Sequence, residues 1–230
     1  MGIQSWFESA LSPECVFCGK RITSQIFCSH CDPRLEIGDK NLCLRCGNPL
    51  THESVQCGEC RSWPWVRDLT CRSQFTLSQR SRWLIHQAKL FRSPHFYRFL
   101  MDGVSLNISE ATLVPVPLHI GKLCQRGFNQ SLLIARWLSR NSGLRVTENQ
   151  LIKVKSTANQ SGLNRRSRGK NLKGAFRWEG ALDSNLIVLI DDVYTTGSTL
   201  REAARTIRRQ GRVPILGWTL FRRIKPLLLA

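Results

Sequence analysis

Acidic residues are scarce in this 230-residue chain, which has 16 Asp and Glu against 34 Lys and Arg and therefore a formal net charge of +18 at pH 7. The deficit is local: residues 1–65 hold six Lys and Arg against seven acids, and the remaining residues hold 28 against nine. A basic excess of this kind attracts polyanions such as nucleic acids, and it is also typical of a solvated face that only keeps a protein in solution. Both interpretations stay open for the second part of the chain.

Long apolar runs are missing as well. No run approaches the ~20 residues that a membrane-spanning helix needs. The first eleven residues lack the basic start and the apolar core of an export signal, and Trp6 stands where myristoylation of Gly2 would require Ser or Thr. We therefore expect a cytoplasmic protein without membrane insertion.

Cysteine, in contrast, is plentiful and regularly spaced. Eight of the ten cysteines form four C-x2-C pairs, separated by nine, eleven and ten residues. Without an export signal, such pairs favour zinc over disulfides or redox pairs. We expect two closed structural zinc sites in sequential order, with a cross-braced order as the alternative and with His30 outside both. The predicted ligands are Cys15, Cys18, Cys28, Cys31, Cys43, Cys46, Cys57 and Cys60.

The chain is expected to divide after the last cysteine pair. Ser62-Trp63-Pro64-Trp65 interrupts any helix or strand. The predicted division is a zinc module at 1–62, a linker at 63–65 and a second domain at 66–230. Because the zinc module has nearly balanced side-chain charge, we interpret it as a scaffold or a contact for another protein.

The most informative stretch of the second domain is 185–211. Its apolar run, 186–190, predicts a strand buried on both faces of a parallel sheet, and Asp191 and Asp192 follow where such a strand ends. The small and hydroxyl residues at 195–199 precede an amphipathic helix that Gly211 should stop. Thr199 and Glu202 fit a capping box. Free amides at a helix start bind phosphate, so acids followed by this loop suit a ribose 5-phosphate.

Residues 188–199 resemble the phosphoribosyl pyrophosphate (PRPP) motif of type I phosphoribosyltransferases throughout. The resemblance implies that Asp191 and Asp192 hold the ribose hydroxyls. It also implies that the 5-phosphate is held by Thr195, Thr196, Gly197, Ser198 and Thr199.

Other patterns place further elements. One or two strands are expected in 66–76, and a helix in 78–91 with Leu84, Ala88 and Phe91 on one side. A strand should start at Ala111 and stop at two prolines. A helix from about 125 to 140 and a strand at 213–220 are expected after it. Cys71 and Cys124 are expected to be buried. Arg222, Arg223 and Lys225 should form a basic tail.

The run Val114-Pro-Val-Pro117, followed by Arg126-Gly-Phe-Asn-Gln-Ser131 and preceded by the paired cysteines, closely resembles the ComF/GntX family of phosphoribosyltransferase-like proteins. The fold it implies is α/β: a type I phosphoribosyltransferase-like parallel sheet flanked by helices, after a small double zinc ribbon. In this family pattern Val114, Pro115 and Val116 lie beside the diphosphate. Arg126 is a candidate diphosphate contact, with an ordinary surface arginine as the alternative.

Residues 153–177 carry eight Lys and Arg and no acid, so this segment is expected to be mobile. In phosphoribosyltransferases the equivalent segment closes over PRPP, and the same charges would equally suit DNA phosphates. The candidate nucleic-acid contacts are Arg165, Arg166, Arg168, Lys170 and Lys173, with few aromatic residues nearby apart from Phe176 and Trp178.

The resemblance implies a PRPP-binding protein linked to uptake of single-stranded DNA in natural transformation, with the zinc module as a contact for a DNA-uptake protein. The alternative is an active Mg²⁺-dependent phosphoribosyltransferase with an unknown acceptor. Mg²⁺ is expected with PRPP, because the triply charged leaving group needs neutralising.

Overall fold

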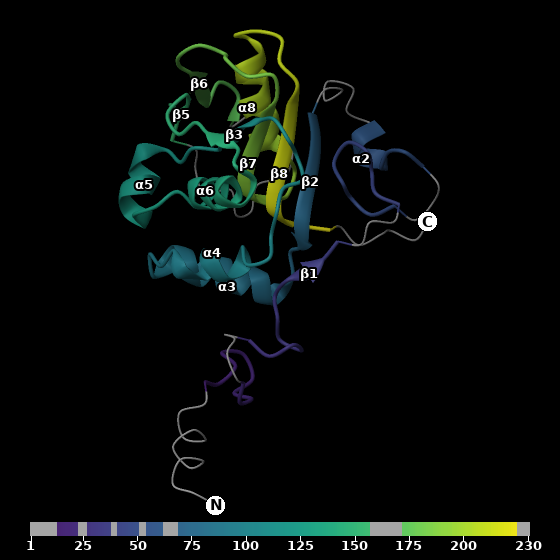
Figure 1. Cartoon of the computed structure of the whole chain (residues 1–230), viewed down its shortest axis with the longest axis vertical. Helices are drawn as coiled ribbons and strands as arrows, with labels where there is room; N and C mark the ends of the chain where they lie inside the picture. The colour runs from purple at the N-terminus through teal and green to yellow at the C-terminus, as the bar shows by residue number, and fades with distance from the viewer. Residues whose placement is uncertain are drawn as a thin grey trace, which may run out of the picture.

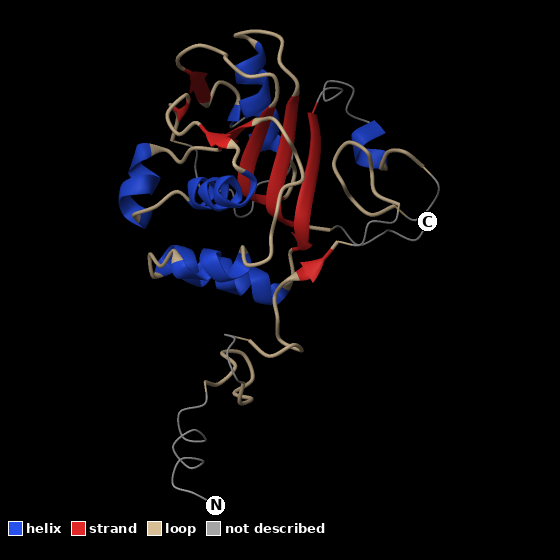
Figure 2. Ribbon diagram, in the orientation of Figure 1, coloured by secondary structure: helices blue, strands red, loops and turns tan. Residues whose placement is uncertain are grey.

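The computed structural model describes residues 13–22, 27–37, 41–50, 54–61, 69–156 and 172–224. Its centre is a six-stranded sheet in the order β1-β2-β8-β7-β3-β4, drawn in Figure 2. β1 is antiparallel to β2, and the other four pairings are parallel. The sheet strands are β1 Leu35–Glu36, β2 Leu69–Thr76, β3 Thr112–Pro115, β4 Arg145–Val146, β7 Ile187–Tyr194 and β8 Ile215–Arg222.

Helices and a small hairpin surround this sheet (Figure 1). The helices are α2 Gly58–Arg61, α3 Gln79–Leu90, α4 His95–Leu100, α5 Ile120–Arg126, α6 Gln130–Ser142 and α8 Ser198–Arg208. The hairpin is an antiparallel pair, β5 Leu151–Lys153 with β6 Phe176–Trp178. Within the described ranges, no helix is both long and apolar enough to cross a membrane. The parallel pairings and the surrounding helices confirm the expected α/β sheet flanked by helices.

The apolar run in β7 is buried on both faces because its side chains alternate between two cores. Val188 and Ile190 lie in the core that includes α6 residues, whereas Ile187 and Leu189 lie in the core that includes α8 residues. Burying an aliphatic side chain of this size contributes about 1.5–3 kcal/mol. This alternation gives a helix–sheet–helix sandwich with β7 at its centre.

β7 continues past Ile190, where the sequence predicts its end, through both acids to Tyr194. β8 pairs with it along this extension and keeps it extended, whereas β3 pairs only as far as Pro115, opposite Ile190. Proline lacks an N–H and a second one follows at Pro117, so β3 cannot continue the ladder. From Asp191 onward the side of β7 that faced β3 is therefore open.

α3 and α4 lie across the carboxyl end of the sheet (Figure 2). α3 begins with a capping box, because the Ser78 hydroxyl accepts a hydrogen bond from the Ser81 amide at 3.1 Å and the Ser81 hydroxyl accepts one from the Ser78 amide at 2.8 Å. Leu84 and Ala88 are fully buried, as expected. Phe91 was expected beside them, but it caps the helix and is 69% exposed.

The first cysteine module packs against α3 and α4. Phe17 meets Trp83 with ring centroids 5.2 Å apart, and Phe27 meets Phe99 at 5.1 Å. The Arg80 guanidinium of α3 donates to the carbonyl of His30 at 2.6 Å. Aromatic burial of this kind fixes the module on the sheet domain.

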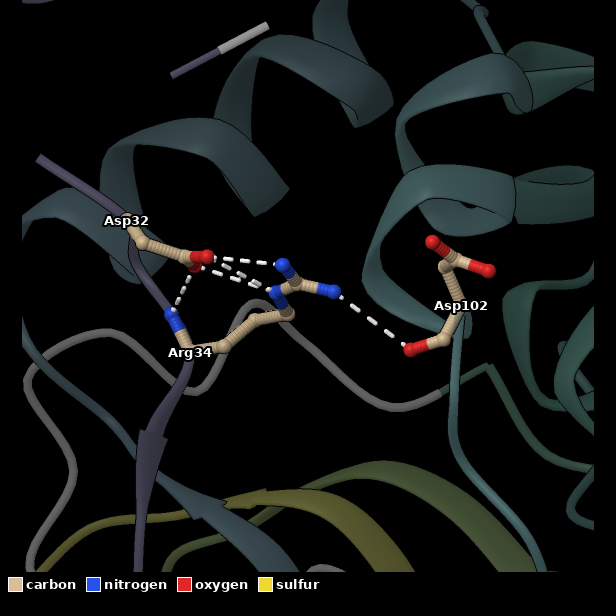
Figure 3. Close-up of polar contacts among 3 residues, drawn as sticks. All are labelled: Asp32, Arg34 and Asp102. Carbon is tan, nitrogen blue, oxygen red and sulfur yellow. Dashed lines mark hydrogen bonds and ion pairs between the residues drawn. The ribbon is translucent and has the colours of Figure 1, made fainter. Parts of the chain in front are cut away.

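Arg34 adds a polar contact on the same side (Figure 3). Its guanidinium donates to the Asp32 carboxylate at 2.7 Å and, more weakly, to the carbonyl oxygen of Asp102 at 3.4 Å. The guanidinium also lies 4.7 Å from the centroid of the Phe99 ring. A residue just after the first module is thus joined to the end of α4.

The second cysteine module lies beside β2 (Figure 1). The Cys71 amide donates to the Arg45 carbonyl at 2.7 Å, and the Arg72 guanidinium donates to the Leu44 carbonyl at 3.2 Å. Gly47 approaches so closely that a Cβ there would lie 3.0 Å from the Cys71 carbonyl oxygen. The two modules therefore contact different parts of the sheet domain.

Burial tests the expectations about several single residues. Cys71 is buried, as expected. Cys124 is exposed, contrary to expectation, because it lies on α5, a helix with no buried residue that the sequence did not predict. Arg222 is not part of a basic tail: it belongs to β8 and is 2% exposed, whereas Arg223 is exposed. Lys225 lies outside the described residues.

Candidate functional site

The acid pair lies where the open side of β7 begins, and each carboxylate has its own partner. The Ser131 hydroxyl, at the start of α6, donates to Asp191 at 3.0 Å. The Lys89 ammonium, near the end of α3, donates to Asp192 at 2.6 Å. Asp191 also accepts the Asp192 amide at 2.9 Å. Two helices, α3 and α6, thus converge on two adjacent residues of one strand.

These partners separate the protonation behaviour of the two acids. Burial, and then the charge of Asp192, raises the pKa of Asp191 from 3.8 to about 7. Burial also acts against ionisation of Asp192, but the charge and hydrogen bond of Lys89 outweigh it and hold the pKa of Asp192 below its usual value. The pair therefore carries one firm negative charge and one that changes near neutral pH.

The loop after β7 leads directly into α8. Gly197 is the N-cap, in the left-handed region at φ 70°, and no side chain caps the helix. A Cβ at Gly197 would collide with the Tyr194 hydroxyl and lie 2.6 Å from Tyr194 Cζ, so only glycine fits. The Arg201 guanidinium donates to the Thr196 carbonyl at 2.6 Å and braces the loop. As at the start of any helix, the first amides of α8 have no acceptor within the helix itself.

The capping box predicted from Thr199 and Glu202 was wrong. α8 begins at Ser198, so Thr199 lies inside its first turn and cannot cap it. Glu202 is 4% exposed and instead accepts the Gly174 amide at 2.7 Å. The carboxylate therefore joins α8 to the segment before β6.

The predicted diphosphate segment borders the acid pair. Val114 and Val116 are buried, so any contact from them to a ligand would use backbone groups. The Val116 amide donates to the Ile190 carbonyl at 2.9 Å, one residue before Asp191. Its carbonyl accepts the Asn129 side-chain amide at 3.1 Å, which fixes the segment to the start of α6.

Arg126 lies in the last turn of α5 and is close to the acids. Its guanidinium donates to the Gln130 side-chain oxygen at 2.6 Å. The Arg126 charge also contributes to the low pKa of Asp192. The structure thus brings together Arg126, both acids and 114–116, while the loop 195–199 follows from the same strand.

The cysteines form two tetrads in the predicted sequential order. Within each tetrad all four Sγ atoms lie within 4.8 Å of one another. Hydrogen bonds from neighbouring thiols lower the pKa of Cys43 and raise the pKa of Cys46 and of Cys60, so these thiols are close enough to affect one another's ionisation. His30 is exposed and belongs to neither group. The tetrads are Cys15, Cys18, Cys28, Cys31 and Cys43, Cys46, Cys57, Cys60.

Most of the predicted basic loop, 157–171, lies outside the described residues, and with it Arg165, Arg166, Arg168 and Lys170. Lys173 is described and exposed. Phe176 and Trp178, the few aromatic residues near this segment, are 6% and 7% exposed and are therefore not available for base stacking. They belong to the β5–β6 hairpin and pack in the core with α8.

Sequence reasoning missed Lys89 and Tyr97 as parts of this site. Lys89 was assigned only to a polar helix face, and nothing in its local spacing indicates a partner 103 residues away. The Tyr97 hydroxyl is buried and has no hydrogen-bond partner among the described residues. Burial and the charge of Asp192 raise the Tyr97 pKa, which places its hydroxyl near the pair.

Comparison with known proteins supports the interpretation of both parts. A family model described as a double zinc ribbon domain matches residues 7–61. The "DNA utilization protein YhgH" of Escherichia coli O6:H1 is 36% identical over 85% of this chain and 89% of its own. "Competence protein F" of Haemophilus influenzae is 31% identical over 90% of each chain. "Competence protein ComFC" of Bacillus subtilis is 27% identical over 85% of this chain and 83% of its own.

Among solved structures, a purine phosphoribosyltransferase from Pyrococcus horikoshii Ot3 is 15% identical, covering 67% of this chain and 87% of that one, with a TM-score of 0.28. The identities to YhgH and competence protein F extend over nearly the full length of each relative. The double zinc ribbon and the parallel-sheet domain follow each other in the expected order. The chain therefore belongs to the ComF/GntX family of phosphoribosyltransferase-like proteins.

Proposed function

We propose that the open side of β7 binds a phosphoribosyl compound, PRPP. The observation that carries this proposal is the position of Asp191 and Asp192, at the point where β3 leaves β7 and ahead of the uncapped start of α8. Carboxylates accept hydrogen bonds from the two ribose hydroxyls, and free helix amides bind the 5-phosphate. One ligand that carries both groups would use both parts of the site.

Each predicted residue has a role in this proposal. Asp191 and Asp192 hold the ribose hydroxyls, and Lys89 keeps the second acid ionised. Backbone groups of Val114, Pro115 and Val116 border the diphosphate, and Arg126 offsets its charge. The 5-phosphate is held by the loop of Thr195, Thr196, Gly197, Ser198 and Thr199.

Mg²⁺ suits this site because the acid pair and the loop hydroxyls offer the oxygen ligands that it prefers. Mg²⁺ would supply neutralisation of the diphosphate charge. Asp192 is already ionised below neutral pH, and Asp191 becomes a full acceptor as the pH rises through about 7. The chain's own residues thus provide the ribose contacts and the phosphate loop.

The cysteine tetrads are proposed to hold two structural zinc ions, because four thiolates without an open position are typical of structural sites. The proposed domains are the zinc module at 1–62, a linker at 63–65 and the phosphoribosyltransferase-like domain at 66–230. The zinc module would also serve as the contact for a DNA-uptake protein.

The relatives named for competence and DNA utilization favour a role in handling single-stranded DNA, with the phosphoribosyl site as its ligand-binding part. The second candidate is an active phosphoribosyltransferase. A buried, cation-paired acid beside a phosphate loop is also what such catalysis requires. For DNA, the basic segment with Arg165, Arg166, Arg168, Lys170 and Lys173 is the proposed contact.

The test is calorimetric titration of PRPP with Mg²⁺ into the protein and into Asp191→Asn/Asp192→Asn. Each charged hydrogen bond contributes about 1.5–3 kcal/mol, so we expect the double variant to lose on the order of 100-fold or more in affinity. Asp183→Asn, an exposed acid outside the site, is the matched control. Unchanged affinity in the double variant would refute the assignment.

A screen of nucleobases and amines for PRPP-dependent product separates the two candidates. Turnover with any acceptor identifies a transferase. Salt-sensitive binding of single-stranded DNA without turnover identifies a DNA-handling protein whose site binds PRPP as a ligand.

A further inference from the structure

A cavity of about 440 Å³ lies between α3 and α5, beside the acid-pair site. Its wall includes Lys89 and Arg92 from the end of α3 and Lys122 and Arg126 from α5, and none of its lining residues is acidic. Lys89 also forms the ion pair with Asp192, which is not among the lining residues. We call it the α3–α5 cavity.

The cations of the α3–α5 cavity crowd one another. Burial, and then the charges of Arg126 and Lys89, lowers the pKa of Lys122. Arg126 donates its hydrogen bond to the neutral amide of Gln130 and not to a carboxylate. Like charges held together in a concave site with no carboxylate on its wall are matched by a bound anion.

The backbone of Arg92 points to the same use. Arg92 has φ 53°, in the left-handed region where a non-glycine residue is strained. Glycine is the residue favoured just beyond the end of a helix, yet the chain has a long cation there, and that cation lines the α3–α5 cavity. The strained position is thus occupied by a side chain able to bind phosphate.

Two exposed apolar residues belong to the stretch of chain that contributes to this cavity. Leu90 lines it and is 62% exposed, and Phe91, between Leu90 and Arg92 in the chain, is 69% exposed. An exposed aromatic ring beside a group of cations is the arrangement by which proteins bind single-stranded nucleic acids: cations contact phosphates and bases stack on the ring.

We propose that the α3–α5 cavity binds a backbone phosphate of a single-stranded nucleic acid, with a neighbouring base stacked on Phe91. A free phosphate or diphosphate would use the cations alone and leave Phe91 without a role. The lining residues are mainly cations, with Gln125 and His86 as the other polar side chains, so we expect contacts to phosphate and a stacked base more than to base edges. This contact deepens the DNA-handling function proposed above: its lining includes no residue of the basic segment 153–177, and it shares Lys89 and Arg126 with the proposed PRPP site.

The test is fluorescence anisotropy of a labelled oligothymidylate over a series of salt concentrations. Arg92→Gln/Lys122→Gln should weaken binding and flatten the plot of log affinity against log salt by about 0.7 for each phosphate that the protein no longer neutralises. The control is Arg82→Gln/Arg145→Gln, which removes the same charge from exposed positions outside the cavity and should keep the slope. Phe91→Ser should lower affinity roughly tenfold at an unchanged slope, because stacking carries no charge.

Equal losses of affinity in the two double variants would overturn the proposal, since net charge alone would then explain binding. The proposal would also be overturned if inorganic diphosphate displaced the oligothymidylate and Phe91→Ser kept full affinity for it. Both results together would indicate a site for small anions. Arg92→Gly serves as a second variant: it relieves the left-handed backbone while removing the cation, so weaker binding at an undiminished melting temperature cannot come from misfolding. If Asp191→Asn/Asp192→Asn still binds the oligothymidylate, the nucleic-acid contact is distinguished from PRPP binding.

Discussion

The Arg222 guanidinium lies over the Tyr194 ring, with Cζ 4.1 Å from the ring centroid. The Arg222 Nε and Nη2 atoms have no hydrogen-bond partner among the described residues. Neighbouring thiols raise the pKa of Cys46 and burial raises that of Cys71, and the Arg222 charge opposes both shifts. Arg222 therefore packs on Tyr194 and is close enough to Cys46 and Cys71 for its charge to affect them.

We predict that Arg222→Met weakens zinc binding but does not lower the melting temperature of the metal-free protein. Four thiolates around a zinc ion leave a net charge of about −2 that a buried guanidinium offsets. Loss of Arg222 should weaken zinc binding at the second tetrad by about tenfold, measured by competition with a chromophoric chelator. In chelator-treated protein the melting temperature should not fall, because a buried unpaired charge is removed. Arg223→Met, the exposed neighbour, is the control; a lower melting temperature in both metal states would contradict this account.

Asp191 should make stability depend on pH. Its pKa, raised from 3.8 to about 7, means that the folded protein binds this proton more tightly than the unfolded chain. Its contribution to stability is therefore full below pH about 4 and is lost as the pH rises through about 7. In Asp191→Asn, the free energy of unfolding should vary less with pH between pH 4 and 8. The decrease that is removed should amount to a few kcal/mol at pH 8. Urea denaturation without divalent ions measures it.

The Asp183→Asn variant should keep the full pH dependence, because Asp183 is exposed and precedes β7, outside the acid pair. An Asp191→Asn curve that follows the unaltered protein would show that another group titrates in this range.

Gly197 and Gly143 allow backbone strain to be separated from steric collision. Both have left-handed φ angles, 70° and 73°, but a Cβ meets Tyr194 only at Gly197 and has no heavy atom within 4 Å at Gly143. Gly143→Ala should cost about 1–2 kcal/mol of unfolding free energy. Gly197→Ala should cost about 1–3 kcal/mol more and should abolish PRPP binding. Equal destabilisation in urea titrations would mean that the Tyr194 contact is unimportant.

Metal analysis should find two zinc ions per chain, and a double variant tests their order. Cys15 and Cys31 belong to the same tetrad, so Cys15→Ser/Cys31→Ser should lose one zinc and retain the other. A cross-braced arrangement would lose both, since these residues come from the first and second cysteine pairs. Cys124→Ser, at an exposed lone cysteine, should retain two.

Local patterns predicted much of this molecule because the groups that define them are close in sequence. The cysteine pairs, the β7 run and the acids beside it are each set by residues within a few positions, and their order was predicted correctly. Contacts between distant segments carry no such signature. Lys89 of α3 reaches Asp192 of β7 across 103 residues. Arg222 looked like part of a basic tail, but it is buried as the last residue of β8. The capping box failed because α8 begins at Ser198, one residue before Thr199, with Gly197 as its N-cap.

β2 shows what the cysteine modules do for the sheet as a whole. Its outward side carries backbone N–H and C=O groups that would otherwise be free to pair with a strand of another molecule. β1, which follows the first tetrad, covers Phe75 and Thr76, and the second module covers Cys71 through the Arg45 carbonyl. Metal bound at the tetrads would hold both modules in place and so keep this edge of β2 covered. Protein stripped of metal should self-associate through β2 at temperatures where its sheet is still folded.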